Sequence, residues 1–107
     1  MVRSADEVVA IVDKAVMLLR RRIPVQEAWL FGSYVHGQPQ EESDIDLAVF
    51  SPAVDNMTFM QRIDLIVAVE MEVGAEIELH LFPASGLRNA RPSNMYGHVR
   101  LTGKRVA

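Results

Sequence analysis

Apolar residues recur at helical spacing across residues 8–19, where they form one wide stripe. Just before them, Ser4 and Glu7 have the spacing of a capping box, in which each side chain satisfies a backbone N–H of the first turn. Three arginines, Arg20-Arg21-Arg22, follow the stripe, and positive charge is favourable at the negative end of a helix. We therefore predict a helix from Ser4 to about Arg21, and we interpret the arginine triplet as its solvated end.

A second segment, residues 57–73, is apolar around nearly the whole helical circumference. Its apolar positions are Phe59, Met60, Ile63, Leu65, Ile66, Val67, Val69, Met71 and Val73. We expect this helix to begin with Asp55 or Asn56 as its cap and to end at Gly74. A helix of this kind is buried on more than one side. Either the sheet and the first helix cover it completely, or it reserves a surface for another chain, and both interpretations stay open.

Three shorter segments have the composition and the alternation of β-strands, namely residues 25–31, 44–50 and 76–82. In the second and third of them, alternate apolar side chains point into a core: Ile45, Leu47 and Val49, and then Ile77, Leu79 and Leu81. The remaining segments are predicted as a loop over residues 84–92, a last helix over residues 93–102 that Ser93 caps and Gly97 interrupts, and an edge strand over residues 104–107. This order of elements predicts an α+β fold with a small mixed β-sheet and helices packed on one face.

Length and charge narrow the class of protein. A chain of 107 residues fits a single domain over residues 1–107 with a modest core. Eleven basic and fourteen acidic residues give a net charge of −3, which argues against general nucleic-acid binding, although residues 84–107 form a basic tail. Cys is absent, which excludes disulfides and thiol nucleophiles. No apolar run approaches the roughly 18 residues of a membrane span, and no signal peptide is recognisable, so we expect a soluble, cytoplasmic protein without membrane contact.

The stretch from Gly32 to Val49 carries the candidate chemistry. Gly32-Ser33 forms a turn directly after an apolar strand, where exposed backbone N–H groups and a hydroxyl can bind phosphate. Farther on, Asp44 and Asp46 lie one residue apart in a strand, so their side chains point the same way with backbones about 7 Å apart. Paired carboxylates suit a hard divalent cation, which takes oxygen ligands. Phosphate ligands next to metal ligands indicate a nucleoside triphosphate that carries magnesium.

The pattern G-S-x-x-x-G followed by S-D-x-D-L, within residues 32–49, resembles the signature of the nucleotidyltransferase superfamily that includes DNA polymerase β. The short chain resembles the minimal branch of that superfamily, the MNT proteins that are often paired with HEPN toxins. The resemblance implies a nucleotidyltransferase fold similar to the palm of polymerase β. It also implies that Asp44 and Asp46 are catalytic and hold one or two Mg²⁺ ions.

Members of this superfamily carry a third carboxylate in an apolar-Asp-apolar triplet, which aligns here with Ile77-Glu78-Leu79. Strand alternation places Glu76, Glu78 and His80 on one face, so Glu76 is the alternative by parity alone. The alignment selects Glu78 as the third catalytic and metal-binding carboxylate. Glu in place of the usual Asp moves the carboxylate by more than about an ångström, whereas magnesium prefers near-ideal octahedral geometry at about 2.0–2.1 Å. This departure predicts a retuned site or weak activity.

The resemblance also implies a set of nucleotide-binding residues, namely Gly32, Ser33, His36 and Ser43. Gly32 and Ser33 would position the β- and γ-phosphates at the start of a short helical turn. Relatives usually carry Arg or Lys where His36 stands, so His36 would bind phosphate as a partly neutral group. Ser43 is expected to cap or tighten the entry to the second strand.

The function that the resemblance implies is Mg²⁺-dependent transfer of a nucleotide, with AMP from ATP as the expected group, to a hydroxyl of a partner protein. Few residues remain to build an acceptor pocket, so we expect the acceptor to be a partner protein or a second copy of the chain. The resemblance implies a HEPN-type helical protein as that partner. The expected role is an antitoxin that modifies a tyrosine of its HEPN toxin. Two alternatives stay open: a small-molecule nucleotidyltransferase of the aminoglycoside-modifying type, and a non-catalytic antitoxin that acts by binding alone.

Overall fold

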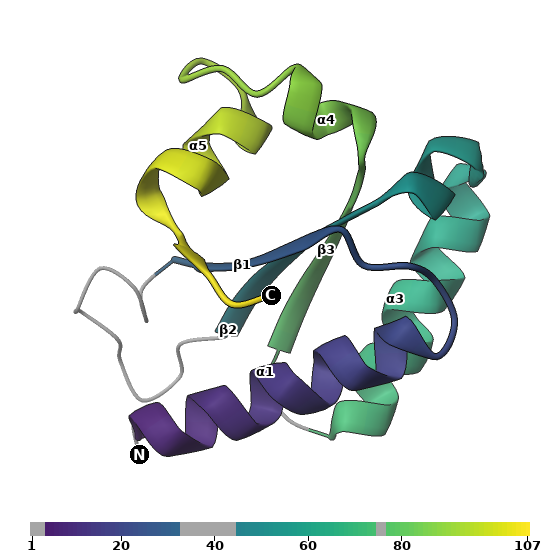
Figure 1. Cartoon of the computed structure of the whole chain (residues 1–107). Coiled ribbons are helices and arrows are strands. Elements are labelled where there is room, and N and C mark those ends of the chain that lie inside the picture. The colour runs from purple at the N-terminus through teal and green to yellow at the C-terminus, as the bar shows by residue number, and fades with distance from the viewer. Residues whose placement is uncertain (1–3, 33–44, 75–76) are drawn as a thin grey trace.

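A four-stranded mixed sheet lies at the centre of the protein, as the computed structural model in Figure 1 shows. The structure describes residues 4–32, 45–74 and 77–107. The strands are β1 (Glu27–Phe31), β2 (Ile45–Ser51), β3 (Ile77–Pro83) and β4 (Lys104–Arg105), and their order in the sheet is β3-β2-β1-β4. β1 is antiparallel to β2 and to β4, whereas β2 and β3 are parallel. The predicted small mixed sheet is confirmed.

Two long helices, α1 (Ala5–Arg20) and α3 (Phe59–Val73), cover one face of this sheet (Figure 1). The backbone N–H of Glu7 donates a hydrogen bond of 3.2 Å to Ser4 Oγ, so Ser4 is the predicted N-terminal cap of α1. The core between helices and sheet contains the strand residues that alternation had directed inward: Ile45, Leu47, Val49, Ile77, Leu79 and Leu81. This burial fixes the opposite face of β2 and β3 as the face for polar chemistry.

The start of α3 differs from the prediction. Residues 52–56 form a 3-10 helix, η1 (Pro52–Asn56), so neither Asp55 nor Asn56 caps α3. Thr58 is the cap instead, because its hydroxyl accepts a hydrogen bond from the N–H of Gln61 at 3.1 Å while the Gln61 side chain accepts from the N–H of Thr58 at 2.9 Å. Such a reciprocal pair satisfies two backbone donors of the first turn, those of Thr58 and Gln61. The end at Gly74 is as predicted, with φ +68°.

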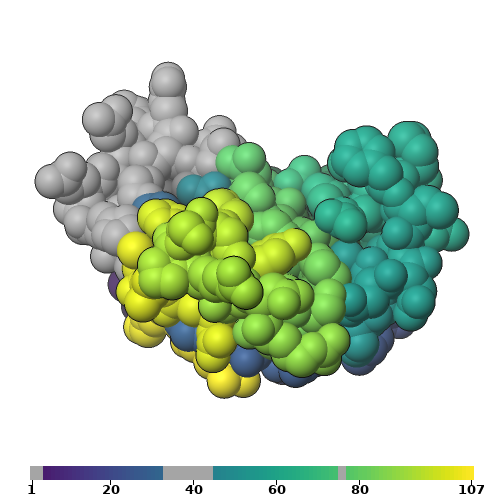
Figure 2. All heavy atoms as spheres, turned by 90° about the horizontal axis from the view of Figure 1, so that it is seen from above, coloured from purple at the N-terminus to yellow at the C-terminus, as the bar shows by residue number. Residues whose placement is uncertain are grey.

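Two shorter helices, α4 (Ser85–Arg88) and α5 (Met95–Thr102), lie on the other side of the sheet, so helices are not confined to one face. Val99 of α5 packs in a second apolar cluster with Phe31 and Ala48. The part of the chain predicted as loop therefore contains α4, and α5 is capped by Asn94, whose side chain accepts from two backbone N–H groups. Seen from this side, the atoms of α4 lie next to those of η1 (Figure 2).

Gly97 was expected to interrupt the last helix, but it lies inside α5, and close packing explains why a glycine is needed there. A Cβ atom on Gly97 would lie 1.8 Å from the carbonyl oxygen of Arg91, so the missing side chain lets the preceding loop pack against the helix. The helix continues through this position to Thr102. The edge strand that follows is shorter than predicted, because β4 spans Lys104–Arg105 alone.

The outer side of α3 is not fully covered by the sheet and α1. Leu65, Val69 and Val73 are buried, whereas four large apolar side chains of the same helix are exposed: Phe59, Met60, Val67 and Met71. Among the described residues, no helix combines the length and the apolar character that crossing a membrane requires.

Candidate active site

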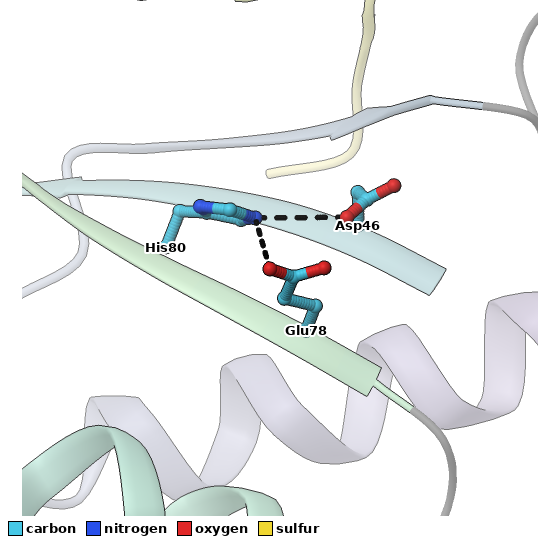
Figure 3. A group of neighbouring side chains, drawn as sticks. All are labelled: Asp46, Glu78 and His80. Atoms are coloured by element: carbon cyan, nitrogen blue, oxygen red, sulfur yellow. Dashed lines mark ion pairs between the residues drawn. The ribbon is translucent and has the colours of Figure 1, made fainter. Parts of the chain in front are cut away.

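The candidate site lies where β2 and β3 run side by side. In their parallel register Asp46 is opposite Glu78, and Ala48 is opposite His80. Because side chains two residues apart point to the same face of a strand, Asp46, Glu78 and His80 all leave the face that α1 and α3 do not cover. One ligand atom from each of the three lies within 4.8 Å of the others. Figure 3 shows the three side chains turned toward one another.

His80 is directed at both carboxylates. Its Nε2 atom lies 3.6 Å from Oδ1 of Asp46 and 3.9 Å from Oε1 of Glu78 (Figure 3). The ring lies against Phe31, with ring centroids 5.1 Å apart, and against Phe82 at 6.2 Å. The side chains of Asp46 and His80 are each 24 % exposed and that of Glu78 is 57 % exposed. The site is therefore half-sheltered, with Glu78 at its more open side.

Gly32, the first residue after β1, lies against Asp46. Its φ is +82°, which L side chains rarely adopt, and a Cβ atom built on it would lie 2.3 Å from Oδ2 of Asp46. Phe31 is the register partner of Asp46 in the antiparallel pair of β1 and β2, which brings the turn to the carboxylate. Gly32, which the turn motif predicted, is thus required for two reasons: its backbone conformation and the close approach of Asp46.

These three side chains fit a divalent cation. Two ligands that each lie about 2.1 Å from one ion are at most about 4.2 Å apart. The distances from His80 Nε2 to Asp46 and to Glu78, 3.6 and 3.9 Å, meet this limit. The full span of 4.8 Å exceeds it slightly, and a small movement of the exposed Glu78 side chain closes the difference. Asp46, Glu78 and His80 could therefore hold one ion.

The described residues include part of the predicted site. Gly32 and Glu78 both lie beside Asp46, Gly32 by close approach and Glu78 by strand register. Four other predicted site residues, Ser33, His36, Ser43 and Asp44, lie outside the described residues, as does the alternative carboxylate Glu76.

Sequence reasoning did not assign His80 to the site. Alternation placed His80 on the same face as Glu78, which was the available signal. Alternation does not reveal that β3 pairs with β2. This pairing places Nε2 of His80 3.6 Å from Asp46.

A second hollow, of about 340 Å³, opens between α5 and the sheet and is lined by Trp29, Ala90, Arg91, Pro92, Gly97, Arg100 and Leu101. The indole N–H of Trp29 donates a hydrogen bond of 2.8 Å to Glu27, and Nε of Arg100 lies 4.0 Å from the same carboxylate. The described residues that line this hollow include no carboxylate or imidazole, so it offers fewer groups for chemistry than the acid-rich site does.

Comparison with known proteins defines the class of this one. Residues 13–89 match the family described as polymerase beta nucleotidyltransferase, and the chain belongs to that family. It is thus an enzyme of the nucleotidyltransferase class with the corresponding α+β fold. The match includes every described member of the candidate site, from Gly32 to His80.

The relatives point to one branch of the family, the minimal nucleotidyltransferases. Protein adenylyltransferase MntA of Thermococcus cleftensis is 31% identical over 76 residues, which are 71% of this chain and 75% of the relative. A crystal structure of a toxin-antitoxin complex with AMP-PNP has a TM-score of 0.62 and 31% identity, covering 87% of this chain and 69% of that one. A structure of tri-AMPylated Shewanella oneidensis HEPN toxin with MNT antitoxin has a TM-score of 0.59 and 28% identity. The match covers 90% of this chain and 68% of that one.

Proposed function

We propose that this protein is a protein adenylyltransferase that transfers AMP from ATP to a hydroxyl of a partner protein. The observation that carries the proposal is the register of β2 and β3, which sets Asp46 beside Glu78 with Gly32 against Asp46. Similarity to MntA supports protein as the acceptor, and the complex with AMP-PNP supports an adenine nucleotide as the donor.

The carboxylates of Asp46 and Glu78 would hold Mg²⁺ together with Asp44, the first acid of the S-D-x-D motif. When bound, the ion neutralises charge that develops on the triphosphate oxygens during the displacement. Asp46 is held by the packing of Gly32 against it, so its carboxylate is already oriented before the nucleotide arrives. Orientation of this kind lowers the barrier because no reorganisation is needed when the charge develops.

The remaining roles fall on residues around this pair. The turn that begins at Gly32 would bind the phosphates through Ser33, His36 and Ser43. An acceptor hydroxyl would attack the α-phosphorus, the bond from that phosphorus to the bridging oxygen would break, and pyrophosphate would leave. Glu78, which is more exposed than Asp46, is placed either to accept the hydroxyl proton or to bind the ion.

The proposed acceptor is a HEPN-type helical protein, and the proposed role of the chain is that of its antitoxin. The structure of AMPylated HEPN toxin bound to an MNT antitoxin supports this assignment. A second copy of the chain is the alternative acceptor, because the described residues near the acids leave the site open on the side of Glu78.

Intact-mass analysis of the co-expressed partner, with ATP and Mg²⁺ present, tests the proposal. We expect the partner to gain the mass of AMP with the wild-type chain and to lose this gain with Asp46→Asn, alone or combined with Asp44→Asn. Asp13→Asn, an exposed acid on α1, is the matched control and should leave labelling intact. An unmodified partner that is still bound would overturn the proposal in favour of neutralisation by binding alone. Labelling of an added aminoglycoside instead would favour the small-molecule enzyme.

A further inference from the structure

His80 brings a third donor atom to a site whose other two donors are the carboxylates of Asp46 and Glu78. Its Nε2 atom is buried and, within the described residues, has no hydrogen-bond partner. A buried polar atom of this kind requires an explanation, since leaving it unsatisfied is energetically costly. The two nearest acceptors, on Asp46 and Glu78, lie 3.6 and 3.9 Å away. Both distances exceed the 2.7–3.2 Å range of ordinary N–H···O hydrogen bonds.

We propose that Nε2 of His80 is a direct ligand of the cation held by Asp46 and Glu78, and that this nitrogen makes the site prefer Mn²⁺ to Mg²⁺. The proposal rests on the proposed function, in which the two carboxylates hold that cation. It adds a ligand to this site and a preference among metals.

The spacing of the three donors supports a shared ion over a direct ion pair. Atoms that are too far apart for hydrogen bonds, yet closer than about 4.2 Å, are at the separation of two ligands on one ion. The Nε2 atom of His80 has this relation to both carboxylates at once. Figure 3 shows that the ring edge carrying Nε2 faces the gap between the two acids. A cation in this gap would satisfy the buried nitrogen and reduce the repulsion between the carboxylates.

The surroundings hold the imidazole in this orientation. Phe31 packs against the ring from β1 with centroids 5.1 Å apart, and Phe82 contacts it from β3 at 6.2 Å. Aromatic neighbours restrict ring rotation and offer no competing hydrogen-bond partner. The side chain is three-quarters buried, so water does not readily replace it as a ligand.

A nitrogen ligand changes which metal the site favours. Mg²⁺ strongly prefers oxygen ligands and retains several waters. Imidazole suits first-row transition metals better, and Mn²⁺ also accepts the carboxylates that remain. A site of two carboxylates and one imidazole is therefore better matched to Mn²⁺ than a site built of carboxylates alone.

Electron paramagnetic resonance with Mn²⁺ alone as the probe tests this assignment. We expect spin-echo modulation from a directly bound ¹⁴N in the wild-type chain, replaced by ¹⁵N coupling when the protein is made with ¹⁵N-histidine. The sequence contains three histidines, so His36→Gln combined with His98→Gln leaves His80 as the sole source and should keep the coupling. His80→Gln should lose the coupling and weaken Mn²⁺ binding by about tenfold or more, while Mg²⁺ binding changes less.

The outcomes separate this proposal from the proposed function. Mn²⁺ that binds without histidine coupling, and is lost in Asp46→Asn, would overturn the role of His80 and leave the carboxylate site standing. Coupling that disappears in the His36→Gln and His98→Gln double variant would also overturn it. No Mn²⁺ binding by the wild-type chain would overturn both. Because the double variant alters no residue of β2 or β3, the assignment can be decided even if His80→Gln does not fold.

Discussion

Gly32 shows how a single missing side chain can shape the site. With φ at +82° and the carboxylate of Asp46 occupying the space of a Cβ atom, Gly32→Ala should strain the backbone and displace Asp46 together. We expect a loss of roughly 1–2 kcal/mol in the free energy of unfolding from the backbone alone. We also expect at least about a tenfold loss of AMP transfer, because displacing a catalytic group by an ångström is costly. Denaturant unfolding and an ATP-dependent labelling assay measure the two effects.

Gly74 provides the matched control for this substitution. Its φ of +68° is comparable, but among the described residues, its chain neighbours aside, no atom lies within 4 Å of the Cβ position. Gly74→Ala should therefore reduce the free energy of unfolding by a similar amount while transfer activity is retained. If both variants lose activity equally at equal stability, the contact between Gly32 and Asp46 does not matter for function.

The three donor side chains also predict how metal affects stability. An ion that binds the folded chain alone raises the free energy of unfolding, by about 2.7 kcal/mol at a concentration one hundred times its dissociation constant. Addition of Mn²⁺ should therefore raise the melting temperature of the wild-type chain, and Asp46→Asn should show little or no rise. Without metal, Asp46→Asn should be as stable as the wild type or more stable, since one of two adjacent acids is neutralised. Thermal unfolding with and without Mn²⁺ gives the comparison, and equal metal shifts in both chains would contradict the site.

At the scale of elements, Glu70 links α3 to the strand that carries Glu78 and His80. β3 is at the edge of the sheet, and the backbone N–H of Leu79 donates a hydrogen bond of 2.8 Å to Oε2 of Glu70. Glu70→Ala leaves this N–H without its charged acceptor and should lower the free energy of unfolding by about 1–3 kcal/mol. Glu72→Ala, at an exposed position of the same helix, should have little effect. Urea titration of the two variants measures the difference, and equal losses would refute the link.

A second link joins η1 to α4 and depends on pH. A hydrogen bond from Ser85 lowers the pKa of Asp55 below its ordinary value of 3.8, and the Ser85 N–H lies 3.4 Å from Oδ2. A lowered pKa in the folded state stabilises the protein above the unfolded pKa, and this contribution is lost as the pH falls below about 3.8. Asp55→Asn should therefore show a smaller decline in stability on acidification than the wild type does. Unfolding midpoints between neutral and acidic pH test this, with Asp64→Asn as the control at an exposed position.

Local signals predicted most elements, and the misses have one local and one long-range cause. The cap at Ser4 and the end at Gly74 are decided by residues within one helical turn, and both predictions are confirmed. The predicted start of α3 was wrong because Asp55 belongs to η1, and the reciprocal pair of Thr58 and Gln61 caps α3 instead. The pairing of β2 with β3 depends on contacts between distant parts of the chain, so the position of His80 beside Asp46 could not be read from alternation.

At the scale of the whole molecule, the exposed side of α3 is a candidate surface for the partner. Met60, Val67 and Met71 are spaced by seven and four residues, which places them on one stripe of the helix. The stripe lies near the proposed active site, because the neighbouring Glu70 bonds to the backbone beside Glu78. A partner that binds α3 could therefore reach around the edge strand to place its hydroxyl at the acids.

Met71→Glu tests this surface with little risk to the fold, because the Met71 side chain is 77% exposed. If the partner covers this side chain, burying a carboxylate in its place should weaken the complex by at least about tenfold, which corresponds to 1.4 kcal/mol. Met95→Glu makes the same change on α5, across the sheet from α3, and should leave the affinity unchanged. Size-exclusion chromatography and calorimetry with the purified partner distinguish the two variants. If Met71→Glu binds as the wild type does and Met95→Glu does not, the partner docks on the α5 side, and the exposed stripe of α3 has another role.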